Sequence, residues 1–441
     1  MHLLIKAEQF VFYLLLFSIP IQTRAILWQQ NWYFNEWQSI SLYGTDLLLL
    51  ILFVFWKLNS SNKLKFKISK PSPDIYLLIF LIFAALSIKN SDSVVLSAYQ
   101  FLKLTEFVLF YFYIKTYALN KFKAIYSFFA IFCSGVLQAL IGIIQFLRQS
   151  DLGLRYLGET ALRPDMSGVA VFFNSLGEKV MRPYGVTPHP NILAAVLFVA
   201  VFSFYGWYLY KRDPLSSKSE KAVFGLYGIT FFALLITFSR TVLFILFAGL
   251  SIRLFLFWRL KLYEKPKLKV KLKKIIITSI VVSVIFGFLY FPEAKSRFSL
   301  SSKEEAVTLR VYYNKESLKA GLNWTGVGIG NFVNWFMTND PYQEKWFYQP
   351  AHNIYLLIYS EIGLPGLISF VLFLIFSIKK FILVTGMHKI SEYSILVLFL
   401  SLLFIGFFDH FLWTLQQGRF LFWLTLALLS ETYIKNVQSH A

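Results

Sequence analysis

The sequence is poor in charge and in cysteine. Only 15% of its 441 residues are charged, whereas 57% are hydrophobic and Phe alone supplies 49. A soluble protein of this length does not bury so much apolar material, so the soluble globular classes are excluded. The single cysteine, Cys133, lies inside an apolar run and cannot form an internal disulfide. We interpret Cys133 as a packed thiol within a membrane-spanning segment.

Nucleotide-binding and metal-binding motifs are also missing. No P-loop occurs, no GxGxxG follows a predicted strand, and no CxxC is present. No two histidines have metal-ligand spacing, and no Asp-x-Asp motif falls on the predicted outer face. These absences argue against ATP and nucleotide-sugar chemistry. We therefore predict neither a cofactor nor a metal.

The sequence does contain a series of apolar runs of roughly 18–22 residues, the length at which a helix crosses about 30 Å of hydrocarbon. The runs are unbroken and do not alternate in period two, as the strands of a membrane barrel would. We predict an all-α polytopic membrane protein with about twelve transmembrane helices. The predicted helices cover residues 7–23, 41–57, 74–88, 94–115, 123–147, 190–210, 221–238, 241–258, 274–291, 353–378, 391–408 and 411–432.

The placement of basic residues predicts the orientation. A net charge of +20 is compatible with nucleic-acid binding, but the lysines and arginines gather in alternate loops, which indicates membrane topology instead. With the basic loops inside, both termini are cytoplasmic and two large loops are periplasmic. The predicted divisions are helices 1–5 (1–147), the first large loop (148–189), helices 6–9 (190–291), the second large loop (292–352), and helices 10–12 with a short tail (353–441).

Polar clusters interrupt the apolar pattern on the predicted outer side. The first, Arg182 to Asn191, ends the first large loop, and its His189 either caps the next helix or joins Arg182 in binding an anion at the helix N-terminus. The second is Ser239-Arg240, in a short turn between two apolar segments. Arg240 either extends toward lipid headgroups or faces inward as a phosphate ligand.

The third cluster contains Arg310. It lies in a predicted amphipathic surface helix over residues 302–322, in which Ser302 has capping-box spacing. The apolar side chains that repeat along one face are Val307, Val311, Leu318 and Leu322. A glycine-rich turn with Gly328 and Gly330 follows. This turn lacks the preceding strand of a dinucleotide site and is explained by a close approach of the backbone to a neighbour.

The fourth cluster begins at His352-Asn353, where the second large loop re-enters the membrane. A lone histidine there is often a capping or packing residue, but histidine also suits a general base beside a substrate hydroxyl. Glu361 is expected to stabilise the fold. Asp409-His410, in the last outer turn, is left without a role, since solvation at the interface explains it.

Taken in order, these segments resemble the O-antigen ligase and polymerase superfamily. The residues that carry the resemblance are Arg182-Pro-x-Gly…His189-Pro-Asn191, Ser239-Arg240, Arg310 before residues 326–332, and Ala351-His352-Asn353 with Glu361-x-Gly363-Leu-x-Gly366. The resemblance implies a GT-C-type glycosyltransferase of the bacterial inner membrane, with its active site facing the periplasm. It also implies an undecaprenyl-diphosphate-linked glycan as donor and no need for metal or ATP.

The resemblance implies roles for the polar residues as well. Arg240 and Arg310 would bind the diphosphate with help from Arg182, and His352 would take the proton of the acceptor hydroxyl. Direct attack on the anomeric carbon would invert it. The residues expected to support this site are Ser239, His189, Asn191, Asn353, Glu361, Gly328 and Gly330.

Alternatives remain for the acceptor and for the class of protein. The acceptor is a sugar of the lipid A core in a ligase, which the large loop at 292–352 favours, or a second lipid-linked repeat in a polymerase. A transporter for lipid-linked glycans is the alternative from another class. It is disfavoured because no internal repeat is visible and no polar cluster is apparent in the first four predicted helices. The expected partners are the donor, a glycan acceptor and membrane lipids, and not nucleic acid.

Overall fold

The computed structural model describes residues 2–59, 72–211, 214–261, 264–298, 305–387 and 390–430. Ser302 of the predicted capping box lies outside these ranges. So do some of the lysines and arginines in the loops that we predict to be cytoplasmic: Lys63, Lys65, Lys67, Lys70, Arg212 and Lys389.

Helices make up most of the described chain, and each of the twelve predicted segments contains one. They are α1 (His2–Ser18), α2 (Gly44–Asn59), α3 (Asp74–Ser87), α4 (Val94–Tyr113), α6 (Ala124–Arg148), α7 (Pro190–Tyr210), α8 (Ser217–Ile236), α9 (Arg240–Arg259), α10 (Pro266–Leu289), α14 (Ile354–Thr385), α15 (Ile390–Ile405) and α17 (Gln416–Leu428). Seven helices in the described ranges are long and apolar enough to cross a membrane, and a shorter apolar helix covers Glu392–Ile405. A mostly helical, multi-pass membrane protein is therefore confirmed, whereas twelve crossings and cytoplasmic termini stay predictions.

Shorter elements connect the long helices. They are α5 (Leu119–Lys121), α11 (Phe291–Phe298), α12 (Glu305–Ala320), α13 (Phe332–Asn339), α16 (Phe411–Thr414) and two hairpins, β1 (Arg24–Gln29) with β2 (Ser39–Tyr43) and β3 (Val171–Phe173) with β4 (Lys179–Met181). Both hairpins are antiparallel. The sequence analysis predicted only helices, because strands of three to six residues inside polar loops leave too short a pattern to detect.

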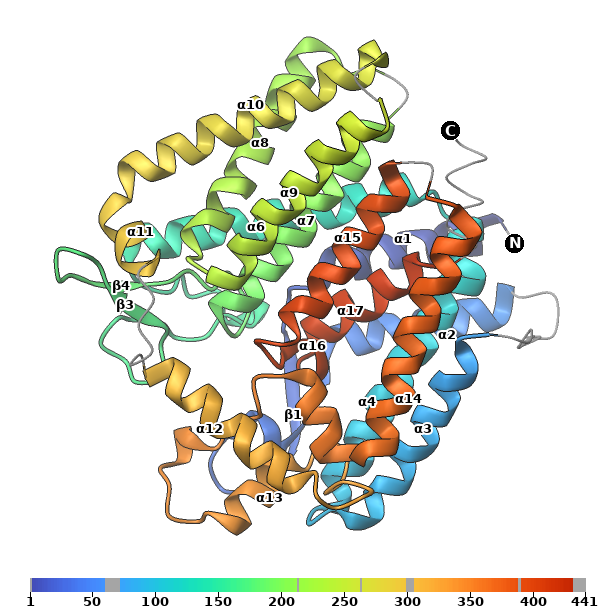
Figure 1. The fold of residues 1–441 in the computed structure, drawn as a ribbon, viewed down its shortest axis with the longest axis vertical. Helices are drawn as coiled ribbons and strands as arrows, with labels where there is room; N and C mark the ends of the chain where they lie inside the picture. The colour runs from blue at the N-terminus through green and yellow to red at the C-terminus, as the bar shows by residue number, and fades with distance from the viewer. Residues whose placement is uncertain are drawn as a thin grey trace.

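The long helices form two groups that meet at α7 (Figure 1). One group packs α6 along α7, with α8 and α10 beside them, and the other packs α14 against α3 and α4 against α17. Most of α7 is buried, as expected for a helix surrounded by others. Its first turn therefore lies at the meeting point of both groups.

Two helices are interrupted where the prediction had them continuous. The predicted helix 411–432 is divided into α16 and α17 at Leu415, whose backbone is extended. The side chain of Arg419 compensates for this break by donating from Nε to the carbonyl oxygen of Trp413 (2.6 Å). In α14 the helix is kinked at Gly363 (φ 83°, ψ 179°), where the backbone passes close to the carbonyl oxygen of Trp324.

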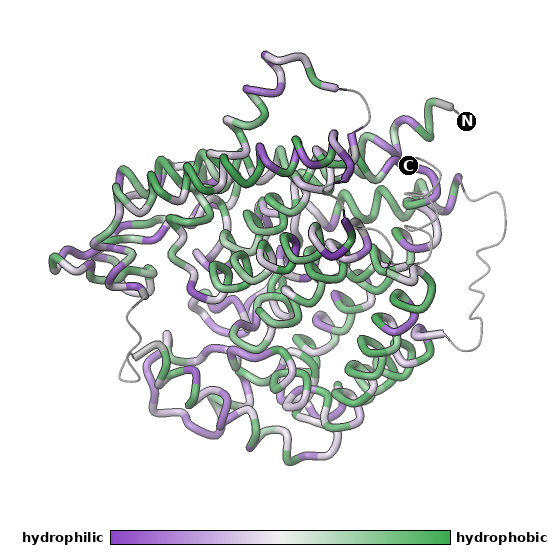
Figure 2. Tube along the Cα trace, turned by 45° about the horizontal axis from the view of Figure 1, so that its top comes forward, coloured by the Kyte–Doolittle hydropathy of each residue, from purple (hydrophilic) through white to green (hydrophobic). Residues whose placement is uncertain are grey.

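The segment that carries α12 and α13 is largely hydrophilic, in contrast to the long helices (Figure 2). The predicted surface helix is present as α12, but it packs on the protein through Tyr313 and Ser317. Tyr313 donates to the carbonyl oxygen of Phe347 (2.7 Å) and Ser317 to that of Leu356 (2.8 Å). The apolar stripe points away from the protein: Val307, Val311, Leu318 and Leu322 are 36, 49, 48 and 81% exposed. The position of this helix over the membrane surface stays a prediction.

Candidate active site

A chain of hydrogen bonds joins the loop after β4 to α7 and to the turn after α15. Buried Arg182 donates from Nε to the carbonyl oxygen of Thr237 (2.7 Å) and from Nη2 to Oδ1 of Asn191 (2.8 Å). Ser239 Oγ donates to the same oxygen (3.3 Å), and Asn191 Nδ2 donates to Oδ2 of Asp409 (3.0 Å). Asn191 therefore connects an arginine on one side to a carboxylate on the other.

His189 is the residue before α7 and caps that helix. Its Nδ1 accepts a hydrogen bond from the backbone N–H of Asn191 (3.2 Å), as in the capping interpretation weighed above. Because Nδ1 accepts, the neutral ring carries its proton on Nε2. The cap orders the first turn of α7 and so holds the Asn191 side chain in place.

Two histidines from different parts of the chain lie against each other next to this network. The rings of His352 and His410 meet edge to face, with centroids 5.0 Å apart. Tyr313 of α12 stacks on His352 (5.8 Å), and Trp37 meets the edge of His410 (5.1 Å). Nδ1 of His410 lies 2.7 Å from Oγ1 of Thr414. Four segments far apart in sequence thus fix the two rings.

The two ring nitrogens of His352 differ in their surroundings. Nδ1 is buried and has no hydrogen-bond partner among the described residues. The segment before α14 places the ring between Tyr313 and His410, so Nε2 is the nitrogen left for a ligand. A histidine in this arrangement can accept a proton from a bound hydroxyl.

Arg310 of α12 acts on the same cluster. Its positive charge lowers the pKa of buried Arg182 and of half-buried His189 and His352, whose pKa values are already lowered by desolvation. In the described part of the chain, no hydrogen bond or ion pair joins the Arg310 guanidinium to a protein group. Within the described residues, Arg310 therefore brings a positive charge without a direct ion-pair partner, although it attracts the carboxylate of Asp409.

The protonation states follow from burial and from these charges. Burial lowers the pKa of His352 to about 3, His410 and Arg310 add to the effect, and Asp409 opposes it. The His352 ring is thus neutral at neutral pH. Burial by itself raises the pKa of Asp409, but the charges of His410, His352, His189 and Arg310 outweigh it and hold this pKa at about 2. The cluster consequently combines two arginines with one ionised carboxylate.

Arg240 stands at the edge of this cluster. It is the first residue of α9, and its Nε donates to the carbonyl oxygen of Arg297 at the end of α11 (2.6 Å). The charge of Arg297 lowers the pKa of Arg182, so Arg297 is a further cation at the border of the site, and it was not among the predicted residues. Arg297 also lies over the Phe172 ring (5.4 Å). The cationic region thus extends from α12 toward α11.

Other predicted residues shape the fold around the site. Asn353 caps α14 by accepting from the backbone N–H of Tyr355 (2.9 Å) and of the residue after it. Gly328 donates its N–H to the carbonyl oxygen of Glu361 (3.0 Å), whose carboxylate accepts from Nε1 of Trp413 (2.9 Å). Gly328 has φ +101°, and a Cβ there would contact α4 and the turn before it. These contacts hold the glycine turn against the kink of α14.

The residues brought together are therefore Arg182, His189, Asn191, Ser239, Arg310 and His352, joined by Asp409 and His410. Sequence reasoning left the last pair without a role. The only signal that could have selected them is an acid and a histidine adjacent in a short outer turn. In the described residues no group of three or more His, Cys, Asp or Glu side chains is placed to hold a metal ion; metal independence stays a prediction.

The fold and the site together define a multi-pass helical membrane protein with a cationic histidine site. Residues 225–371 match the family model described as O-Antigen ligase, which confirms the resemblance to the O-antigen ligase superfamily. Arg240, Arg310 and His352 lie within the matched segment, whereas Arg182 and Asp409 lie outside it. The family supports a function of the O-antigen ligase or polymerase type. No curated protein matches this sequence.

Proposed function

We propose that this protein transfers a glycan from undecaprenyl diphosphate to a sugar hydroxyl on the periplasmic face of the bacterial inner membrane. The observation that carries the proposal is the position of the Arg310 charge beside the open ring of His352. A diphosphate leaving group needs cations, and an attacking hydroxyl needs a base. Both requirements are met within one cluster.

The arginines bind and stabilise the diphosphate. Charge-assisted hydrogen bonds from guanidinium to phosphate are strong and often bidentate, and burial strengthens them. Arg310 makes the first contact because no protein carboxylate among the described residues occupies it. Arg240 and Arg182 contribute further positive charge as the bond between the anomeric carbon and the diphosphate oxygen breaks. The leaving diphosphate takes the electron pair of that bond.

His352 acts as the base. Its neutral ring accepts the acceptor's hydroxyl proton at Nε2 while the hydroxyl oxygen bonds to the anomeric carbon, which inverts that centre. The low pKa of His352 describes the site without ligand. A bound diphosphate places negative charge near the ring and raises this pKa, because an opposite charge favours the imidazolium. Donor binding thus prepares the base.

A ligase is the form of this reaction that we favour. The reason is the long segment between α10 and α14, which carries α12 and α13 and lies over the cluster as a surface for a large acceptor such as the lipid A core. A polymerase would use the same base and arginines with a second lipid-linked repeat as acceptor. The two reactions leave different products on the cell surface.

The test is a lipopolysaccharide profile of a deletion strain complemented with wild type, His352→Ala or Arg310→Gln. Arg163→Gln is the matched control, because Arg163 is 65% exposed and pairs only with its neighbour Asp165 in the described chain. We expect wild type and the control to restore long-chain material, and the two site variants to fail at equal protein levels.

The product in the failing strains identifies the reaction. Polymerised glycan stranded on undecaprenyl diphosphate means a ligase, and a core that bears a single repeat means a polymerase. An unchanged profile in the deletion strain would refute both and would favour another surface polymer or transport.

A further inference from the structure

A second polar pocket lies behind His410, between α4, α17 and the β1–β2 hairpin. Its empty volume of about 790 Å³ includes the open solvent at its mouth, so the case for a ligand depends on the side chains that line it. Its wall includes Trp37 and Thr414, which both contact His410, and Pro350, which is two residues before His352. The pocket and the candidate active site therefore share a wall.

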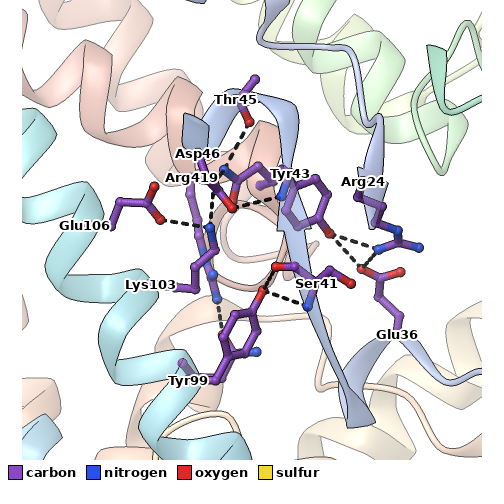
Figure 3. Close-up of polar contacts among 12 residues, drawn as sticks. Arg24, Glu36, Ser41, Tyr43, Thr45, Asp46, Tyr99, Lys103, Glu106 and Arg419 are labelled. Atoms are coloured by element: carbon purple, nitrogen blue, oxygen red, sulfur yellow. Dashed lines mark hydrogen bonds and ion pairs between the residues drawn. The ribbon is translucent and has the colours of Figure 1, made fainter. Parts of the chain in front are cut away.

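Four charged side chains line the pocket, and three of them are labelled among the polar contacts of Figure 3: Lys103, Glu36 and Arg419; the fourth is Glu361. Lys103 of α4 pairs with Asp46 of α2 (2.6 Å) and with Glu106 (2.8 Å). Arg24 and Glu36 form another pair at the hairpin. We predicted no polar cluster in the first four helices, and the ion pairs of Lys103 contradict that expectation. Ionisable residues that lie among apolar membrane helices are costly and usually mark a site.

Two polar groups of the pocket are left available by the protein. Oε1 of Gln416 is buried and has no hydrogen-bond partner in the described chain, although its Nε2 donates to Asp46 and to Thr45. Arg419 donates to the carbonyl oxygen of Trp413 and to Oε1 of Gln100 (2.6 Å), and no carboxylate of the described residues forms an ion pair with it. The unmet acceptor favours a ligand that donates from hydroxyl groups, and the remaining N–H groups of Arg419 can donate to the oxygens of the same ligand.

Aromatic rings complete the lining. Trp37, Tyr43, Tyr99, Trp413 and Trp423 all border the cavity. An aromatic face packs well against the C–H face of a pyranose ring, while amides, carboxylates and guanidinium groups bond its hydroxyls. The combination of rings with planar polar side chains matches a sugar better than it matches an inorganic ion or a lipid tail.

We propose that this pocket is a sugar subsite, which holds a pyranose unit of the glycan beside His410 and the transfer site. The inference rests on the proposed function, since it assigns the pocket to that reaction's saccharide. The bound unit belongs either to the donor glycan or to the acceptor glycan, and both present the same ring and hydroxyl chemistry. The subsite positions the saccharide, and it does not take part in bond making.

The hairpin offers a matched pair of variants, because alternate residues of β2 face opposite ways. Ser41 is buried on the pocket side, whereas Leu42 is 39% exposed on the other side. Tyr99 Oη bonds only the backbone of Ser41, so a new side chain leaves that contact intact. Ser41→Phe fills the pocket and Leu42→Phe is the control. Val333→Phe fills it independently from α13.

Binding is measured on the purified full-length protein with three probes. They are undecaprenyl diphosphate without sugar, the glycan-bearing carrier that accumulates in the deletion strain, and the core oligosaccharide freed from lipid A of that strain. We expect both filling variants to bind at least one glycan probe at least 10-fold more weakly than wild type. All proteins should bind bare undecaprenyl diphosphate alike. If the filling variants bind the glycan-bearing carrier more weakly, the pocket holds a sugar of the donor. If they bind the core oligosaccharide more weakly, it holds a sugar of the acceptor.

Other results would overturn the subsite. Glycan binding that is equal in wild type and in the filled variants would do so, as would the absence of measurable binding of either glycan probe to wild type. Loss of bare-carrier binding in both filling variants would mean that the pocket serves the fold. Failure of wild type to bind undecaprenyl diphosphate at all would instead contradict the proposed function, and so the two failures are distinct.

Discussion

The hydrogen bond between Asn191 and Asp409 allows a test in which the negative charge is moved from position 409 to its bonding partner at position 191. In Asn191→Asp, a second carboxylate stands where an amide now donates to Asp409 over 3.0 Å. In the double variant with Asp409→Asn, the pattern is restored in reverse. The amide at position 409 then donates to the carboxylate at position 191, and that carboxylate still accepts from Arg182. The oxygen of the amide at position 409 still accepts from the backbone N–H of His410.

The magnitude follows from the geometry. Two carboxylates about 4 Å apart at an effective dielectric constant of about 20 repel each other by roughly 4 kcal/mol. Protonation of one of them at neutral pH costs about the same, at roughly 1.4 kcal/mol for each of about three pKa units. A stronger bond from Arg182 returns about 1 kcal/mol. We therefore expect Asn191→Asp to destabilise the protein by about 3 kcal/mol, and the double variant to lie within about 1 kcal/mol of wild type.

The assay is heat-induced unfolding of the three purified proteins in one detergent, run beside glycan transfer in the complemented strain. Stability should recover in the double variant. Transfer should not, because the carboxylate has moved away from His410 and His352. A double variant no more stable than Asn191→Asp would refute the network. Full recovery of transfer would refute the need for a carboxylate at Asp409.

Three further predictions concern the base, the kink and the diphosphate. Because burial lowers the pKa of His352 from 6.5 to about 3, the unfolded chain takes up this proton at a higher pH than the folded protein, and stability should fall from about pH 7 to pH 4. His352→Gln should reduce this dependence of the melting temperature on pH, and an unchanged dependence would contradict the lowered pKa. Gly363→Ala should destabilise the protein by at least about 2 kcal/mol in the same melting assay, since its Cβ would lie 2.1 Å from the carbonyl oxygen of Trp324 and φ is +83°. The control Gly287→Ala has open space around it in α10 and should be neutral or stabilising; equal effects of the two variants would argue against strain at the kink. Arg310→Gln should lower transfer about 100-fold with little change in melting temperature, and Arg310→Lys should keep part of the activity; similar transfer in all three proteins would remove Arg310 from the site.

The helices were predictable because a run of about 20 apolar residues has few other solutions in a membrane. The side chains through which α12 packs on the protein were not predictable. In water an apolar stripe turns toward the protein core, but next to lipid it can turn outward, and the packed face then carries Tyr313 and Ser317. The sequence pattern is the same in both cases, so only the tertiary contacts decide.

The site was predictable in part for a similar reason. Arg182, Arg310 and His352 interrupt apolar or amphipathic segments, and such interruptions are visible in a sequence. Asp409 gains its significance from Asn191, which lies 218 positions earlier. No local pattern encodes a contact of that length, and the same holds for the pairing of Lys103 with Asp46.

The contact between Asn191 and Asp409 also bears on the biogenesis of this protein. Membrane helices are made and inserted from the N-terminus onward, so α7 is in place well before the turn that follows α15 has been synthesised. Until that turn arrives, Arg182 lacks the carboxylate at the other end of its network, and His352 lacks the ring of His410. The nascent chain consequently completes this candidate site only after the turn that follows α15 has been made and has packed against α7.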